Sequence, residues 1–188
     1  MRIVSGAYRG RALIAPEGRS TRPTADRVRQ ALFDVLAHAS FAPDLDGARV
    51  MDLFAGSGAL GLEAMSRGAA HCLFVETDEA ARGAIRTNLD ALGLIGVGRV
   101  HRRDAADLGP RPATDGAPFD LVFLDPPYAK GLGEAALAGL LAGGWLADDA
   151  LCVLERGADV LDPAVDGFHL IDTRRWGPAA VHFMKAST

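Results

Sequence analysis

The chain has 188 residues, enough for one domain of ordinary size with a small appendage, and 49% of them are hydrophobic. No apolar stretch approaches the about 18 residues that a membrane span needs, and the start, MRIVSGAYRGR, lacks the apolar region of a signal peptide. The two cysteines, Cys72 and Cys152, lie far apart inside apolar runs, which favours buried thiols over a disulfide or a zinc site. These features argue against a membrane protein, and we expect a cytoplasmic protein that needs no metal.

The net charge of −4 is unevenly distributed along the chain. Residues 1–30 hold seven arginines against Glu17 and Asp26, a balance of +5, which leaves −9 for the remaining residues. A basic arm on an acidic body suits a polyanionic partner such as RNA. The same arm is also compatible with a solvated, arginine-rich surface, and the charge pattern leaves both interpretations open.

The predicted elements begin with two short alternating runs, 2–5 and 11–14, which indicate a small hairpin around GAYRG. Thr24 fits an N-cap, and apolar residues at helical spacing predict a helix over about residues 25–38. The turn-rich segment 41–47 then leads into alternating strands and helices. We predict strands over 48–54, 71–76, 98–103, 119–125, 150–156, 168–175 and 179–185, helices over 58–67, 79–93 and 134–143, and a loop over 110–118.

This alternation indicates the α/β class. Short strands rich in Val, Leu and Phe are typical of a sheet that helices cover on both faces. We therefore predict a doubly wound, mainly parallel, Rossmann-like sheet of seven strands, whose last two strands form an antiparallel hairpin at one edge. We expect a basic hairpin and helix extension over residues 1–43 and the main domain over residues 44–188.

Carboxylates follow four successive predicted strands: Asp52, Glu76, Asp104 and Asp125. In a doubly wound sheet, ligands bind beyond the carboxyl ends of the strands, so these four side chains should share one rim. Any one of them could be a helix cap, as could Asp78. Four acids on one rim repel one another unless a ligand compensates their charge, which predicts a binding site there.

A glycine-rich loop follows the first of these strands. Gly56, Gly58 and Gly61 satisfy the G-x-G-x-x-G spacing of a dinucleotide site, and Glu76 would suit a ribose. Asp52, however, would repel a pyrophosphate and attract an ammonium or sulfonium group, which favours S-adenosylmethionine over a nicotinamide cofactor. We expect cofactor contacts from Asp52, Phe54, Ala55, Gly56, Gly58, Glu76, Thr77, Asp104 and Ala105.

The segment DPPY, residues 125–128, ends the fourth strand of this alternation. An exocyclic amine on a base is a poor nucleophile, because its lone pair is delocalised into the ring. The Asp125 carboxylate and the Pro126 carbonyl can each accept one N–H of such an amine, and Pro127 keeps residue 126 extended. Tyr128 offers a face on which a flipped base can stack. A strand-terminating turn with an edge tyrosine is the alternative structural interpretation.

In order along the chain, DLFAGSGALGLEA, Glu76, Arg-Asp-Ala at 103–105 and LDPPY resemble class I S-adenosylmethionine-dependent methyltransferases that carry a (D/N)PPY motif. The stretches RIVSGAYRGRAL and RPTADRVRQALFDVL are similar to the RsmD family of small-subunit ribosomal RNA guanine-N2 methyltransferases. The TRRWG segment also resembles that family, which usually has Tyr where Trp176 stands here.

This resemblance implies methyl transfer to the exocyclic N2 of a guanine in 16S rRNA, with Asp125, Pro126, Pro127 and Tyr128 at the reacting centre. It places Arg22, Thr24 and Arg27 against cofactor and target, while Arg9 and Arg11 would meet RNA phosphates without reading sequence. The implied partner is 16S rRNA within the small ribosomal subunit, with no membrane involved. No apolar stripe demands a dimer, so we expect a monomer.

Several alternatives remain open at this stage, because the DPPY motif does not choose the substrate. The chain could be an amino methyltransferase acting on another base or on a protein glutamine. It could also be an NAD-dependent oxidoreductase, or a non-catalytic RNA-binding assembly factor that retains a cofactor pocket.

Overall fold

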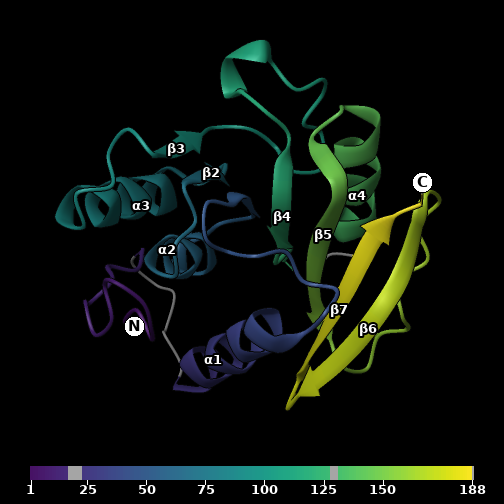
Figure 1. Ribbon diagram of the computed structural model, residues 1–188, viewed down its shortest axis with the longest axis horizontal. Coiled ribbons are helices and arrows are strands. Elements are labelled where there is room, and N and C mark those ends of the chain that lie inside the picture. Colours follow the sequence, from purple (N-terminus) through teal and green to yellow (C-terminus); the bar gives the residue numbers. More distant parts are fainter. Residues whose placement is uncertain (17–22, 128–130, 188) are drawn as a thin grey trace.

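The computed structural model describes residues 1–16, 23–127 and 131–187, and the side chains of residues 23–25 are likewise not described. A sheet with strand order β3-β2-β1-β4-β5-β7-β6 runs through the molecule (Figure 1). Its strands are β1 (Arg49–Leu53), β2 (His71–Val75), β3 (Gly98–His101), β4 (Phe119–Leu124), β5 (Leu146–Gly157), β6 (Phe168–Trp176) and β7 (Ala179–Ala186). The helices are α1 (Pro23–His38), α2 (Ala59–Ser66), α3 (Glu79–Ala91) and α4 (Leu132–Ala142), with one 3₁₀ turn, η1 (Ala113–Asp115).

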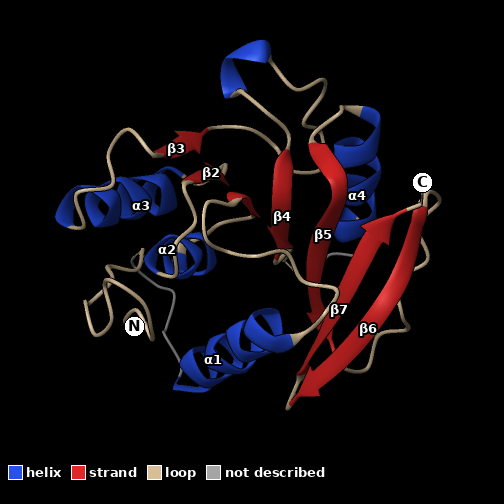
Figure 2. Ribbon diagram, viewed as in Figure 1, coloured by secondary structure: helices blue, strands red, loops and turns tan. Residues whose placement is uncertain are grey.

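Helices cover both faces of the sheet, as the apolar strands require (Figure 2). Side chains alternate along each strand, so Phe123 of β4 joins the core shared with α1, α2 and α3. Its neighbour Leu124 joins the opposite core, which α4 covers. Strands β1 to β5 are parallel. From β1 the chain first builds the sheet outward through β2 and β3, and it then returns to add β4 and β5 on the other side of β1. This reversal of strand order confirms the doubly wound α/β prediction.

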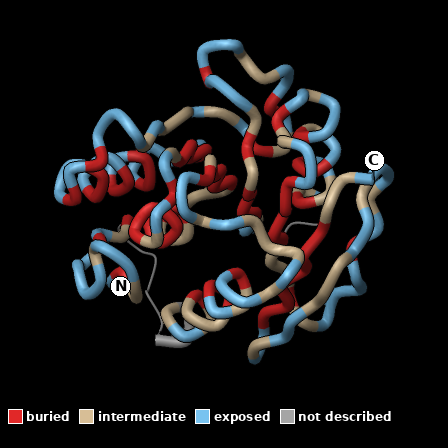
Figure 3. Tube along the Cα trace, in the orientation of Figure 1, coloured by how far each residue is buried: buried red, intermediate tan, exposed pale blue. Residues whose placement is uncertain are grey.

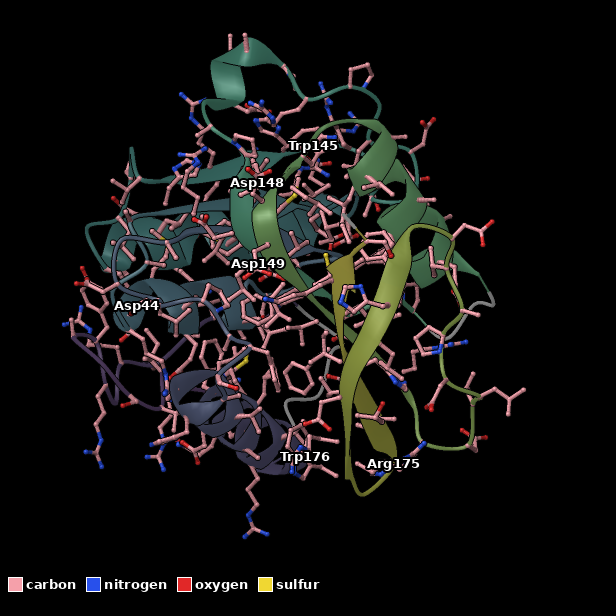
Figure 4. The ribbon with its side chains drawn as sticks, turned by 45° about the vertical axis from the view of Figure 1, so that its right-hand side comes forward. Asp44, Trp145, Asp148, Asp149, Arg175 and Trp176 are labelled. Atoms are coloured by element: carbon pink, nitrogen blue, oxygen red, sulfur yellow. The ribbon has the colours of Figure 1, made fainter. Side chains whose placement is uncertain are left out.

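The last two strands form the predicted antiparallel hairpin at the sheet edge. β7 is inserted antiparallel beside β5, and β6 lies outside it, so the chain's final strand is one position in from the edge. The central strands are buried along most of their length, whereas every residue of β6 is half-buried or exposed (Figure 3). Trp176, where β6 ends, packs against the core on the α1 side (Figure 4).

Some predicted boundaries differ from the observed ones. α1 begins at Pro23, a residue whose fixed φ suits the first helical position, so the N-cap prediction for Thr24 was wrong. β5 starts at Leu146, four residues before the expected start, because it continues past an irregularity in its pairing with β4 between Phe119 and Leu121. The predicted loop over 110–118 contains η1. Among the described helices none is long and apolar enough to cross a membrane.

The N-terminal segment folds back on itself, but its predicted hairpin is reduced to one antiparallel bridge between Arg2 and Ala12. A buried acid on α2 holds this segment in place: Glu63 accepts hydrogen bonds from the backbone N–H groups of Val4 (2.8 Å) and Ser5 (2.9 Å). Ile3 and Leu13 enter the main core beside Phe33 of α1. The division at residue 43 stays a prediction, since both parts share this core.

Removing the Glu63 carboxylate should loosen the N-terminal segment. Glu63 is fully buried and pairs with Arg67 (2.9 Å) and Arg29 (3.7 Å), so Glu63→Ala leaves Arg67 and two backbone donors without this partner, while Arg29 keeps its pair with Asp26. We expect a loss of about 3–5 kcal/mol in the free energy of unfolding, measured with urea, and faster amide exchange over residues 2–13. The exposed Asp90 supplies a control: Asp90→Asn should change stability by less than about 0.5 kcal/mol. Equal effects in the two variants would contradict this role.

Candidate active site

A cavity of about 800 Å³ lies beyond the carboxyl ends of the central strands, within the roughly 300–1,000 Å³ range of small-molecule sites. Five carboxylates and one arginine supply its charged lining. The residues that line it are Phe54, Val75, Glu76, Thr77, Asp78, Arg103, Asp104, Ala105, Asp125, Pro126, Pro127, Leu132 and Glu155. The rim is therefore strongly acidic, in keeping with the prediction from the strand ends.

The loop after β1 turns sharply into α2. Phe54 has a φ of 57°, a left-handed conformation that is costly for a bulky residue, and its side chain is on the cavity wall. Gly56 and Gly58 also have positive φ, at 55° and 76°. Gly61 serves packing instead: a Cβ there would come within 2.4 Å of the Phe74 ring. Of the loop residues expected to contact a cofactor, Phe54 lines the cavity, whereas Ala55, Gly56 and Gly58 do not.

Asp52 is buried beneath this loop rather than on the cavity wall. Its Oδ2 accepts a hydrogen bond from the Gly61 N–H at 2.9 Å. The pKa of Asp52 is raised to about 8, first by burial and then by the negative charges of Asp125 and Glu76, against the lowering effect of the Gly61 hydrogen bond. Once it is ionised, above about pH 8, Asp52 can contribute negative potential to the cavity without lining it.

The raised pKa predicts that Asp52 destabilises the empty protein once it is ionised. An unfolded aspartate titrates near about 3.9, so the cost is absent below about pH 4 and complete above about pH 8. Asp52→Asn keeps an oxygen for the Gly61 N–H and removes the charge. We expect the variant to match wild type near about pH 4 and to be more stable by a few kcal/mol near about pH 8, measured by urea unfolding. Lower stability of the variant at the higher pH would contradict the burial argument.

Glu76 ties the end of β2 to the glycine loop. Its two carboxylate oxygens accept from the Gly56 N–H at 2.8 Å and from the Asp78 N–H at 2.9 Å. Each oxygen has a second lone pair, so the carboxylate can still receive two hydroxyl groups from the cavity. Glu76 thus fixes the loop and offers acceptors at the same time.

Two further acids on the wall have local backbone roles. Asp78 is the N-cap of α3 and accepts from the Ala81 N–H at 2.8 Å, as the helix-cap interpretation predicted. Asp104 accepts from the Ala106 N–H at 2.9 Å, which directs the buried Ala105 backbone along the cavity. Asp104 is exposed, so its other oxygen is accessible to a ligand amino group.

Asp125, Pro126 and Pro127 follow β4 directly onto the cavity wall. The Asp125 N–H lies 3.4 Å from the Leu53 carbonyl oxygen, which continues the ladder from β1 to the edge of the site. Tyr128 lies outside the described residues, so its expected stacking role stays a prediction. The structure therefore brings the two expected acceptor residues, Asp125 and Pro126, to the same cavity as Glu76 and Asp104.

The site prediction from sequence missed five residues that line the cavity: Val75, Asp78, Arg103, Leu132 and Glu155. Glu155 follows Leu154 on β5, and burial and then the charge of Asp125 raise its pKa to about 7. The signal was present: Glu155 is the first charged residue after a run of buried β5 residues, as Glu76 is after β2. Leu132 enters from the start of α4, a position that no strand-end pattern indicates.

The arginines of the N-terminal arm have different environments. Arg2, Arg9 and Arg27 line a second cavity of about 390 Å³ between the N-terminal segment and α1. Arg11 donates to the Ala91 carbonyl at the end of α3 (2.9 Å), and the buried Arg29 pairs with Asp26. Arg22 lies outside the described residues, as does the side chain of Thr24. Among the described arm residues, Arg2, Arg9 and Arg27 thus line one cavity together with a single acid, Asp26.

The strand order and the acidic rim define a Rossmann-like methyltransferase fold, and comparisons with known proteins agree. The family model described as Conserved hypothetical protein 95 matches residues 1–185. The chain belongs to this family, the RsmD family.

Individual relatives support this membership. The "Ribosomal RNA small subunit methyltransferase D" of Escherichia coli (strain K12) is 43% identical over 155 residues, which cover 82% of this chain and 74% of the relative. The Bacillus subtilis (strain 168) protein YlbH is 39% identical over 175 residues, covering 93% and 92% of the two chains. The solved structure of yhhF from Escherichia coli superposes with a TM-score of 0.82 at 37% identity, covering 99% of this chain and 97% of that one.

Proposed function

We propose that this protein transfers a methyl group from S-adenosylmethionine to the exocyclic N2 of a guanine in the 16S rRNA of the small ribosomal subunit. The observation that carries the proposal is the cavity itself, where five carboxylates and the Pro126 backbone gather against one arginine. Its relatives named as small-subunit rRNA methyltransferases support the substrate class.

The cavity suits a cationic cofactor better than a dinucleotide. A pyrophosphate would need free N–H donors at the glycine loop and the start of α2. Two such donors are already taken by carboxylates, the Gly56 N–H by Glu76 and the Gly61 N–H by Asp52. Phosphate charge would also be repelled by the carboxylates that line the cavity, whereas the sulfonium and ammonium groups of S-adenosylmethionine would be attracted. We therefore assign the ribose hydroxyls to Glu76 and the adenine amino group to Asp104.

Asp125 and Pro126 would orient the target amine. S-adenosylmethionine supplies an electrophilic methyl group when bound. The Asp125 carboxylate and the Pro126 carbonyl oxygen each accept one N–H of the amine, which turns its lone pair out of conjugation and toward the methyl carbon. N2 must lose a proton when it is methylated, and the Asp125 carboxylate, which lines the cavity, would accept it. Water can then remove that proton.

The proposed RNA-binding surface is the cavity lined by Arg2, Arg9 and Arg27. Contacts from these side chains to phosphates would position the RNA without reading its sequence. Reversing Arg9 and Arg27 to Glu should weaken binding to the small subunit at least about tenfold and reduce its salt dependence, measured by filter binding. The same double reversal at Arg86 and Arg102, two exposed arginines that line neither cavity, should have little effect. Equal loss in both variants would indicate a general charge effect.

The decisive experiment for the proposed function is mass mapping of 16S rRNA from cells that lack the gene, before and after treatment with purified protein and S-adenosylmethionine. We expect one guanine to lack an N2 methyl group and to regain it on treatment. A fully methylated 16S rRNA in the deletion strain would contradict the proposal, as would methylation only of a protein glutamine or of another base.

A further inference from the structure

Glu155 stands beside Asp125 on the wall of the acidic cavity. The β4·β5 pairing ends in register at Leu124 and Leu154, so Asp125, which directly follows β4, lies level with Glu155, the next residue of β5. Successive side chains of an extended chain point to opposite faces of the sheet. The two carboxylates therefore lie on the face opposite to the two leucine side chains. Neighbouring strands lie about 4.8 Å apart, so the two carboxylates are close neighbours, and both line the cavity.

The fold makes no evident use of Glu155. No described residue donates a hydrogen bond to its carboxylate, whereas the next residue, Arg156, pairs outward with Glu134 at 3.1 Å. Burial and the charge of Asp125 raise the pKa of Glu155 to about 7, so the pair is unfavourable when both groups are ionised. A ligand that presents adjacent hydrogen-bond donors to both carboxylates would relieve that cost.

Among the possible methyl acceptors, guanine best presents such donors. Its N2 amine lies next to the N1–H on the same edge, so three N–H bonds point outward together. Adenine and cytosine instead flank their amines with an unprotonated ring nitrogen, and a glutamine amide flanks its NH₂ with the carbonyl oxygen. A second carboxylate would face an acceptor in those cases and be repelled.

We propose that Glu155 is a specificity-determining residue that accepts the guanine N1–H while Asp125 and the Pro126 carbonyl oxygen hold the N2 amine. Three acceptors then meet three donors. This inference rests on the proposed function and adds the reason why that site selects guanine. Glu155 would position and select the base, and the reacting nitrogen stays with Asp125 and Pro126.

The test uses small subunits reconstituted with 16S rRNA that carries either guanine or 2-aminopurine at the methylated nucleotide. 2-Aminopurine keeps the N2 amine but has an acceptor in place of the N1–H. At about pH 9, two units above the Glu155 pKa of about 7, wild type should prefer guanine by about 10²-fold in kcat/KM, because an ionised Glu155 would face that acceptor. In Glu155→Gln the side-chain amide can donate to the 2-aminopurine N1, so the preference should fall at least about tenfold.

Glu134→Gln, which removes the same charge outside the cavity, should keep the wild-type preference. If Glu155→Gln lowers kcat/KM for both substrates by the same factor, or changes neither value, Glu155 does not read the base and the inference is overturned.

A second test uses wild-type protein alone, should the variant misfold. Subunits with inosine at the target retain the N1–H and should inhibit better than those with adenosine. Equal inhibition by both would also overturn it. Failure of wild type to methylate guanine at all would instead overturn the proposed function, and the inference with it.

Discussion

Replacing Asp125 with alanine should abolish methyl transfer while S-adenosylmethionine still binds. Asp125 lines the cavity beside Pro126 and would accept one of the two N–H bonds of the target amine. Without it the amine stays conjugated and misaligned, so we expect kcat to fall by roughly 10²–10³-fold or more. Single-turnover transfer of a labelled methyl group to undermethylated small subunits measures this loss directly.

A control separates chemistry from cofactor binding in that experiment. Asp107→Ala removes an exposed acid that does not line the cavity and should keep wild-type activity. The affinity of Asp125→Ala for S-adenosylmethionine should stay within about tenfold of wild type, because Glu76 and Asp104 are unchanged. Full activity of Asp125→Ala would rule out the assigned role. A complete loss of cofactor binding would show that Asp125 holds the cofactor instead.

Replacing Glu76 with alanine should have the opposite profile, with a large loss of cofactor affinity. Glu76 offers acceptors for the ribose and also anchors the Gly56 and Asp78 N–H groups. Removing it deprives two backbone donors of their partner and loosens the strained loop at Phe54. We expect the dissociation constant for S-adenosylmethionine, measured by calorimetry, to rise by about 10²-fold or more.

Glu79 gives a matched control for this variant, since it is an exposed acid three residues further along that does not line the cavity. Glu79→Ala should bind the cofactor with the wild-type constant. An unchanged constant in Glu76→Ala would mean that the carboxylate serves only to hold the loop, and the ribose assignment would be lost.

The strand-end pattern predicted the wall of the cavity well. Glu76, Asp104 and Asp125 line one cavity because parallel strands bring their carboxyl ends to the same edge, which a reading of strand ends can anticipate. The doubly wound order followed from the alternation of strands and helices for a similar physical reason: crossover connections keep neighbouring strands parallel.

Contacts between segments that lie far apart in the chain could not be predicted from the sequence. Arg11 and Arg29 count as free positive charges in the sequence, yet Arg11 caps the end of α3 and Arg29 pairs with Asp26 and Glu63. Asp52 ends its strand like the other acids, but its hydrogen bond to Gly61 places it beneath the loop. Such outcomes depend on how helices pack against the sheet, which local periodicity does not encode.

The most direct test of the acidic cavity is a calorimetric titration of the protein with S-adenosylmethionine and, separately, with NAD. We predict one binding site for S-adenosylmethionine with an affinity that increases as the pH rises toward about 8, because its positive charge favours ionised Asp52. NAD should give no binding heat. Tighter binding of NAD than of S-adenosylmethionine would contradict the assignment of this cavity to a cationic methyl donor.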